Sequence, residues 1–101
     1  MCIRDSVCCA NLKIASHYGE RGRSLYCLQD VAASIENLML VAYALGLGTV
    51  WVGSFDENEV SRILNLPDHI RPVAIVPVGY PDENPPSPGR VGRDHAISHI
   101  R

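Results

Sequence analysis

The sequence has no excess of positive charge. Its nine Lys and Arg residues are outnumbered by eleven Asp and Glu residues, the formal net charge is -2, and Lys13 is the single lysine. A protein that holds nucleic acid needs a basic surface to neutralise phosphates. The composition therefore argues against nucleic acid as a partner.

Several motifs of catalysis and cofactor binding are also missing. No G-x-G-x-x-G follows a strand pattern, no serine lies in a G-x-S-x-G elbow, and no phosphate-binding loop surrounds Lys13. His95 and His99 are four residues apart and could share a helix face, but two ligands do not make a convincing metal site. Hydrolysis, a Rossmann dinucleotide site and metal catalysis are not indicated.

The cysteines offer no metal or disulfide framework. No C-x-x-C pair occurs, and the four cysteines all lie near the N-terminus, at Cys2, Cys8, Cys9 and Cys27. We interpret them as reduced thiols that pack as small apolar side chains. With no secretory signal in the sequence, a cytoplasmic location is expected.

The chain begins abruptly. Residues 1–6, MCIRDS, resemble translated adapter sequence, so we interpret them as a non-native leader. Val7 would then enter in the middle of a domain.

An uncharged run over residues 37–55 has nearly the length that a membrane span needs. Gly46, Gly48 and Gly53 interrupt it, no Lys or Arg anchors its ends, and its second half is β-branched and aromatic. We therefore expect no membrane partner.

The strongest helix signal covers residues 28–45, which are apolar nearly all round. Such a helix must be buried on several sides, in a layered domain or a subunit interface. Residues 7–10 suit the end of a buried strand, and residues 11–26, with two glycines, suit a loop with some helix around it.

Further elements follow this helix. Residues 49–53 have the pattern of a buried strand, and Asp56 with Glu59 has the spacing of a capping box for a helix that ends at Pro67. Residues 73–80 suit a strand in which Pro77 indicates an edge or a bulge.

The order of elements predicts an α+β, or layered α/β, fold with a small sheet flanked by helices. Four of the seven prolines lie in residues 81–88, so residues 81–101 are expected to form an extended arm and tail after the domain part at residues 7–80. Two or three strands beside so apolar a helix look unfinished, which indicates a missing partner.

Two segments are candidates for ligand contact. Trp51, Val52, Gly53 and Ser54 follow a glycine-containing loop, and glycine lets a flat ligand approach the backbone. Arg90 and Arg93 follow the proline-rich stretch and suit bidentate phosphate contacts. The first segment also suits the end of a strand, and the two arginines also suit a solvated basic tail. Spacing alone leaves both alternatives open.

The chain resembles the C-terminal half of the nitroreductase family from about Val7 to Arg93. The resemblance lies in the order and spacing of several segments: YGERGR at 18–23, QDVAASIENL at 29–38, ALGLGTVWVGSFD at 44–56, LNLP at 64–67 and RPVAIVPVGYP at 71–81.

This resemblance implies a nitroreductase-like fold with a mixed sheet, built as a homodimer with FMN at the subunit interface. It implies that the flavin takes hydride from NAD(P)H and passes electrons to a small-molecule acceptor such as a nitro compound or quinone, without a catalytic side chain. Trp51, Val52, Gly53 and Ser54 would line the flavin ring, and Arg90 and Arg93 are the candidates for its phosphate. The family's N-terminal half is absent, so the isolated chain is expected to bind FMN weakly or not at all.

The rival hypothesis is a non-catalytic dimerisation or ligand-binding module that keeps the interface helix but holds no flavin. The sequence does not identify the electron acceptor, nor does it distinguish NADH from NADPH.

Overall fold

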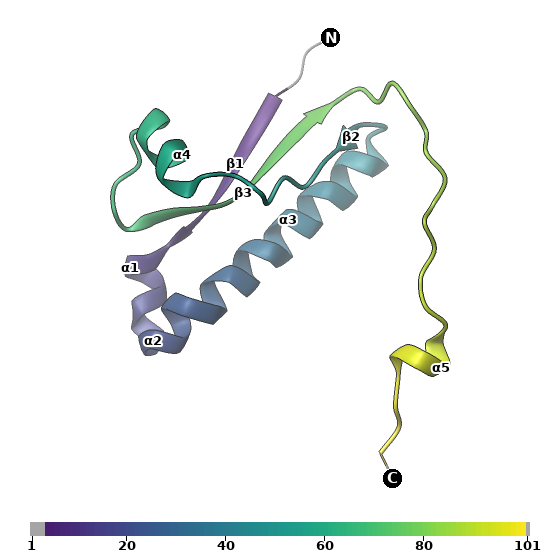
Figure 1. The fold of residues 1–101 in the computed structure, drawn as a ribbon, viewed down its shortest axis with the longest axis horizontal. Coiled ribbons are helices and arrows are strands. Elements are labelled where there is room, and N and C mark those ends of the chain that lie inside the picture. The colour runs from purple at the N-terminus through teal and green to yellow at the C-terminus, as the bar shows by residue number, and fades with distance from the viewer. Residues whose placement is uncertain (1–3, 101) are drawn as a thin grey trace.

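The structure is a computed structural model that describes residues 4–100. Figure 1 shows a small sheet, one long helix and an arm that leaves the domain. The elements in chain order are β1 (Arg4–Asn11), α1 (Leu12–Ala15), the 3-10 turn η1 (Ser16–Tyr18), α2 (Gly19–Arg21), the π turn η2 (Gly22–Tyr26), α3 (Cys27–Ala44), β2 (Gly48–Thr49), α4 (Glu57–Ile63), β3 (Ile70–Gly79) and α5 (Arg93–Ala96).

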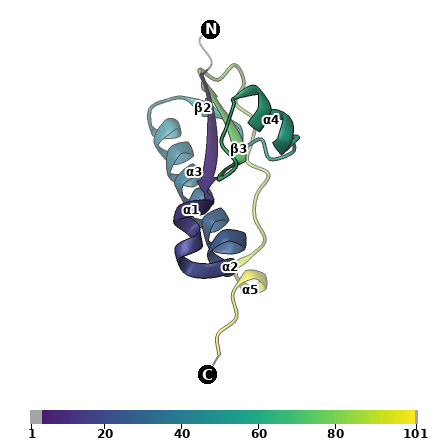
Figure 2. The same cartoon turned by 90° about the vertical axis from the view of Figure 1, so that its left-hand side faces the viewer.

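The three described strands form one sheet in the order β1-β3-β2, with antiparallel pairing on both sides of β3. This confirms an α+β fold with a small sheet. The pairing differs from the mixed sheet that was expected, because each described strand runs opposite to its neighbour. Figure 2 shows α3 on one side of the sheet and α4 on the other, so helices flank it as predicted.

Pro77 lies in the central strand, so the prediction of an edge position was wrong. On the β1 side Pro77 lies opposite Asp5. On the other side Val78 pairs with Thr49, and Val52 forms a bridge with Ile75. Continuing this register places Pro77 opposite Val50, where β2 has already ended. A proline has no N–H to give a neighbouring strand, so the ladder is interrupted at that point.

The irregularity in the β1–β3 ladder occurs elsewhere. Cys8 pairs with Ala74 and Cys9 with Pro72, so the register shifts between the two cysteines. The bulge thus lies next to Pro72 and not at Pro77. β1 itself starts at Arg4, three residues before the strand end that was expected at residues 7–10. The interpretation of residues 1–6 as a leader stays a prediction, and residues 1–3 lie outside the described part.

Residues 12–26 form consecutive helical turns, so the expected helix is present but the expected loop is not. The Asn11 side chain begins the segment, because its Oδ1 accepts hydrogen bonds from the amides of Lys13 and Ile14 at 3.1 and 3.3 Å. Gly22 then permits a close approach. A Cβ there would collide with the Ala15 carbonyl oxygen and lie 2.8 Å from the Tyr18 Cβ. This glycine acts here as a packing residue within consecutive helical turns.

The long helix predicted at residues 28–45 is confirmed as α3, and its inner face makes the core. Ile35 packs with Ala74 and Val76 of β3, each no more than 1% exposed. Gly46, with φ of 77°, ends the helix in a conformation that favours glycine. The outer face has no cover within residues 4–100. It carries Leu40, Val41, Tyr43 and Leu45, which are 58–83% exposed.

The arm is extended as predicted, apart from the one-turn helix α5. Residues 81–92 contain no helix or strand, and the whole stretch 81–100 is exposed. The radius of gyration is 16.8 Å, against about 13 Å for a compact domain of about 100 residues. Figure 1 shows the arm running away from the sheet toward the C-terminus.

The uncharged run at residues 37–55 is not a single helix. α3 ends at Ala44, and the chain turns at Gly46 into β2. By length and composition, one helical stretch of the described residues, Leu12–Ala44, could cross a bilayer. That is a weak indication, because the core helix of a soluble protein passes the same test. This stretch also bends at Gly19, whose φ is 71°.

Candidate functional site

The predicted ring-facing segment, residues 51–54, lies in the connection between β2 and α4. Val52 anchors it: its amide donates to the Ile75 carbonyl at 2.9 Å, and its carbonyl accepts from the Ile75 amide at 3.0 Å. The expected buried strand over residues 49–53 was wrong. β2 ends at Thr49, and Val50 and Trp51 are 59% and 41% exposed. The missing N–H of Pro77 explains why the strand stops.

The backbone beside Val52 faces outward. Along an extended chain, successive residues point their N–H and C=O groups to opposite sides. Because Val52 directs both groups to β3, the corresponding groups of Trp51 and Gly53 point away from it. Residues 51 and 53 therefore offer backbone donors and acceptors at the open edge of the sheet.

Gly53 leaves room for a ligand above the backbone. A Cβ added to it would meet only the Trp51 indole, at 3.7 Å from Nε1 and 3.9 Å from Cδ1. Its φ is not in the left-handed region, unlike those of Gly19, Gly46 and Gly89. Neither the backbone nor internal packing requires a glycine here. What the glycine provides is an unobstructed backbone next to an indole ring.

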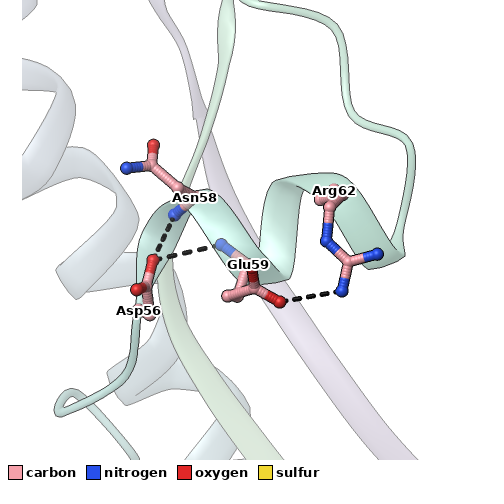
Figure 3. A network of polar contacts seen from close by, with 4 residues as sticks. All are labelled: Asp56, Asn58, Glu59 and Arg62. Carbon is pink, nitrogen blue, oxygen red and sulfur yellow. Dashed lines mark hydrogen bonds and ion pairs between the residues drawn. The ribbon is translucent and has the colours of Figure 1, made fainter.

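The segment ends at the start of α4, where Asp56 caps the helix. Its Oδ1 accepts from the amides of Asn58 and Glu59 at 2.9 and 3.1 Å (Figure 3). Only half of the expected capping box forms. The Glu59 carboxylate pairs with Arg62 at 2.8 Å, as Figure 3 shows, and makes no hydrogen bond back to the Asp56 amide.

A second contact ties α4 to the sheet. Arg71, near the start of β3, donates from Nε to Glu57 Oε1 at 2.9 Å. This hydrogen bond with Glu57 raises the pKa of the Arg71 guanidinium above its usual value. Sequence reasoning did not identify this pair, because 14 residues separate the partners and only the fold brings them together.

The two predicted arginines lie apart from this segment. Arg90 is exposed on the arm and donates from Nη1 to the Gly89 carbonyl at 2.7 Å. Arg93 opens α5. Both views show α5 at a distance from the β2–α4 connection (Figures 1 and 2). One copy of the chain thus brings Trp51, Val52, Gly53 and Ser54 together but does not add the arginines to them.

An open hollow lies between the β2 region and the start of the arm. It is lined by Gly48, Thr49 and Val50 on one side and by the end of β3 with the start of the arm on the other, including Tyr80 and Asp82. Sequence reasoning did not select these lining residues. The proline-rich run directly after a strand was the signal that the chain would leave the sheet there.

The thiols are suited to packing and not to reactivity. Burial raises the pKa of the Cys8 thiol, and burial together with the adjacent Cys8 raises that of Cys9. Cys27 is buried, and its Sγ donates to the Arg23 carbonyl at 3.0 Å. Cys2 lies outside the described residues. Within residues 4–100 no group of three His, Cys, Asp or Glu is arranged to hold a metal ion.

Comparison with known proteins assigns this fold to a family. The chain is 35% identical over 94 residues to an NADPH-dependent oxidoreductase of Staphylococcus aureus (strain USA300), covering 89% of this chain and 38% of that protein. It also resembles two solved structures. A nitroreductase family protein from Clostridium difficile 630 matches with a TM-score of 0.80 and 27% identity, over 94% of this chain and 58% of that one. A nitroreductase family protein from Streptococcus pneumoniae TIGR4 matches with a TM-score of 0.77 and 27% identity, over 87% and 44%.

The chain spans between 30% and 38% of the length of the curated relatives that it matches. The family model described as "Nitroreductase family" matches residues 6–80. This match covers most of the chain and includes α3, the segment 51–54 and all of β3. The chain therefore belongs to the nitroreductase family.

Proposed function

We propose that this chain forms the ring-contacting part of an FMN-dependent oxidoreductase that uses NAD(P)H to reduce a nitro compound, a quinone or a similar acceptor. The observation that carries the proposal is the exposed segment Trp51–Gly53. Here the Trp51 indole lies beside Gly53, which has no side chain, and the backbone N–H and C=O groups of both residues face outward. Membership of the nitroreductase family supports the same reading.

The residues present fit the ring end of FMN. An isoalloxazine is flat and carries hydrogen-bond donors and acceptors along its edge. A glycine backbone lets such an edge approach closely, and, apart from its two chain neighbours, Gly53 has the flat Trp51 indole beside it. The Gly53 amide would then be the donor to the N5 and O4 region of the ring, and Trp51, Val52 and Ser54 would line it.

The phosphate end needs a second source of contacts. Arg90 and Arg93 have the right chemistry, but they lie on the arm away from Trp51 in this copy. A homodimer offers a solution in which the arm of one copy reaches the other. The exposed apolar side chains Leu40, Val41 and Tyr43 on α3 support such an assembly, because burying them favours association.

The protein's part in the reaction is binding and orientation. FMN, when bound, supplies the redox chemistry by accepting hydride from NAD(P)H and passing electrons to the acceptor. The Gly53 amide would orient the ring edge, the Trp51 ring would cover one side and exclude water there, and Arg90 or Arg93 would neutralise phosphate charge. No side chain of the site is required to donate or remove a proton.

The test is the visible spectrum of the purified protein after FMN is added and the excess removed. The 101-residue chain is compared with a version extended by its upstream coding sequence. Trp51 is the single tryptophan of the chain, so quenching of its emission by FMN in the shorter protein reports binding next to it. Of Arg90→Ala and Arg93→Ala, the variant that removes the phosphate contact should lower FMN affinity about tenfold, an effect of about 1.4 kcal/mol. Arg62→Ala is the matched control, since Arg62 is an exposed arginine on α4.

A retained flavin band with NAD(P)H oxidation by an added quinone supports the oxidoreductase. Absence of flavin from both versions contradicts it and favours a non-catalytic dimerisation or ligand-binding module. Sedimentation of both versions separately tests the homodimer.

A further inference from the structure

The segment that faces outward at residues 51–54 is held from two points, and both lie on β3. The first is the pair of backbone hydrogen bonds between Val52 and Ile75. The second is the ion pair between Glu57 and Arg71, with Nε and Oε1 2.9 Å apart. Ile75 and Arg71 belong to the same ten-residue strand, so the two points have a fixed separation.

The connection between these two points is short. Five residue steps separate Val52 from Glu57 and four separate Ile75 from Arg71. A fully extended chain covers about 17 Å in five steps, and four strand steps, here with the irregularity next to Pro72, cover at most about 13 Å. The connection must also turn into α4 at Asp56. Fixing Glu57 therefore restricts the positions open to Gly53 and Ser54.

The Arg71–Glu57 pair contributes little to overall stability. Its side chains are 42% and 46% exposed, and exposed ion pairs contribute between about 0 and 1 kcal/mol. The pair differs in one respect from the Arg62–Glu59 pair, whose atoms lie 2.8 Å apart. Arg62 and Glu59 both lie within α4, whereas Arg71 joins α4 to the sheet. The effect of Arg71 is thus local to the connection between the strand and the helix.

We propose that Arg71 is a positioning residue, which through its hydrogen-bonded ion pair with Glu57 holds the segment 51–54 in the geometry that meets the flavin ring. The role in flavin binding rests on the proposed function, whereas the restriction of the segment does not. The polar partner of Arg71 is Glu57, so Arg71 acts through the start of α4.

The experiment compares Arg71→Ala with Arg62→Ala in the complete gene product that contains these residues. Hydrogen exchange resolved to the peptide covering residues 50–56 measures the restriction without any flavin. Arg71→Ala should speed exchange there about twofold to fivefold, the range that an exposed ion pair provides, with no change over β1 or the middle of α3. Arg62→Ala should leave residues 50–56 unchanged. The reversed pair, Arg71→Glu with Glu57→Arg, should restore slow exchange.

The FMN dissociation constant of the same variants tests the link to the flavin. It should rise about twofold to fivefold for Arg71→Ala, stay constant for Arg62→Ala and recover in the reversed pair. Equal exchange in the Arg71 and Arg62 variants, or faster exchange throughout the protein, overturns the inference. Faster exchange confined to residues 50–56 in a protein that binds no FMN supports the restriction and contradicts the proposed function instead.

Discussion

Val52 and Ile75 exchange two backbone hydrogen bonds, of 2.9 and 3.0 Å, in a stretch where the neighbouring pairs of the ladder are absent. The same register puts Val50 opposite Pro77, which has no N–H. One bridge thus holds a segment that would otherwise be part of a regular strand. The exposed candidate site owes its shape to a proline on the strand beside it.

Replacing Pro77 should therefore repair the ladder. In Pro77→Val the new amide can donate to the Val50 carbonyl and extend β2 through residues 50–52. A net hydrogen bond of about 1 kcal/mol should slow amide exchange at residues 50–52 about fivefold. Pro85→Val, on the exposed arm, is the control. Unchanged exchange in Pro77→Val would show that Pro77 does not cause the break.

Gly53→Ala should separate folding from ligand binding. The added methyl meets only the Trp51 indole, at van der Waals distance, so the free energy of unfolding should change by less than about 0.5 kcal/mol. The same methyl occupies the space through which a ring edge reaches the amide. FMN affinity should fall at least about tenfold, which corresponds to about 1.4 kcal/mol. Urea unfolding and flavin titration measure the two effects, and a variant that binds FMN normally would remove Gly53 from the site.

Gly22→Ala should show the opposite behaviour. Its methyl would collide with the Ala15 carbonyl oxygen and crowd the Tyr18 Cβ, so the helical turns before α3 must shift. Overpacking of this kind costs about 1–3 kcal/mol, measured as a lower urea midpoint. Gly92→Ala is the matched control, because its methyl would have only the His95 ring nearby, at 3.7 Å. Equal stability of the two variants would refute the close packing around Gly22.

The thiols of Cys8 and Cys9 predict a loss of stability in alkaline solution. Burial, the larger cause, raises the pKa of both thiols above the ordinary value, and the charge of Cys8 adds to the effect on Cys9. Their neutral forms are therefore favoured in the folded state. The folded state keeps this advantage below the unfolded pKa, at about 8.5, and loses it as the pH rises through the folded pKa.

The measurement is the urea midpoint between pH 7 and 10, with Cys8→Ala/Cys9→Ala for comparison. The decline above about pH 8.5 should be weaker in the double variant. Parallel curves for the two proteins would contradict the role of these thiols.

The sequence alone determined the features that depend on local pattern. The apolar stretch at residues 28–45 predicted α3 to within one residue at each end, since a long apolar periodicity has few alternatives to a buried helix. The spacing of Asp56 and Glu59 indicated the start of α4, because an N-cap is a contact between residues near in sequence. Resemblance of ordered segments, and not periodicity, identified the family, and the prediction that residues 51–54 face a flavin ring rests on the same resemblance.

Only the tertiary structure decided features that depend on a neighbour distant in sequence. Residues 49–53 have the composition of a strand, yet the strand stops at Thr49 because Pro77 of β3 lies beside the next residue. Glycine usually interrupts helices, yet Gly22 lies within consecutive helical turns. A Cβ at this position would collide with the Ala15 carbonyl oxygen, so the close packing there needs a glycine. Nothing in the local sequence around Arg71 or Glu57 predicts an ion pair, and only the fold brings their Nε and Oε1 atoms to 2.9 Å. The local sequence indicates which secondary structures a segment favours, but it does not indicate which residue lies opposite on the neighbouring strand. That opposite residue decides whether the favoured structure forms.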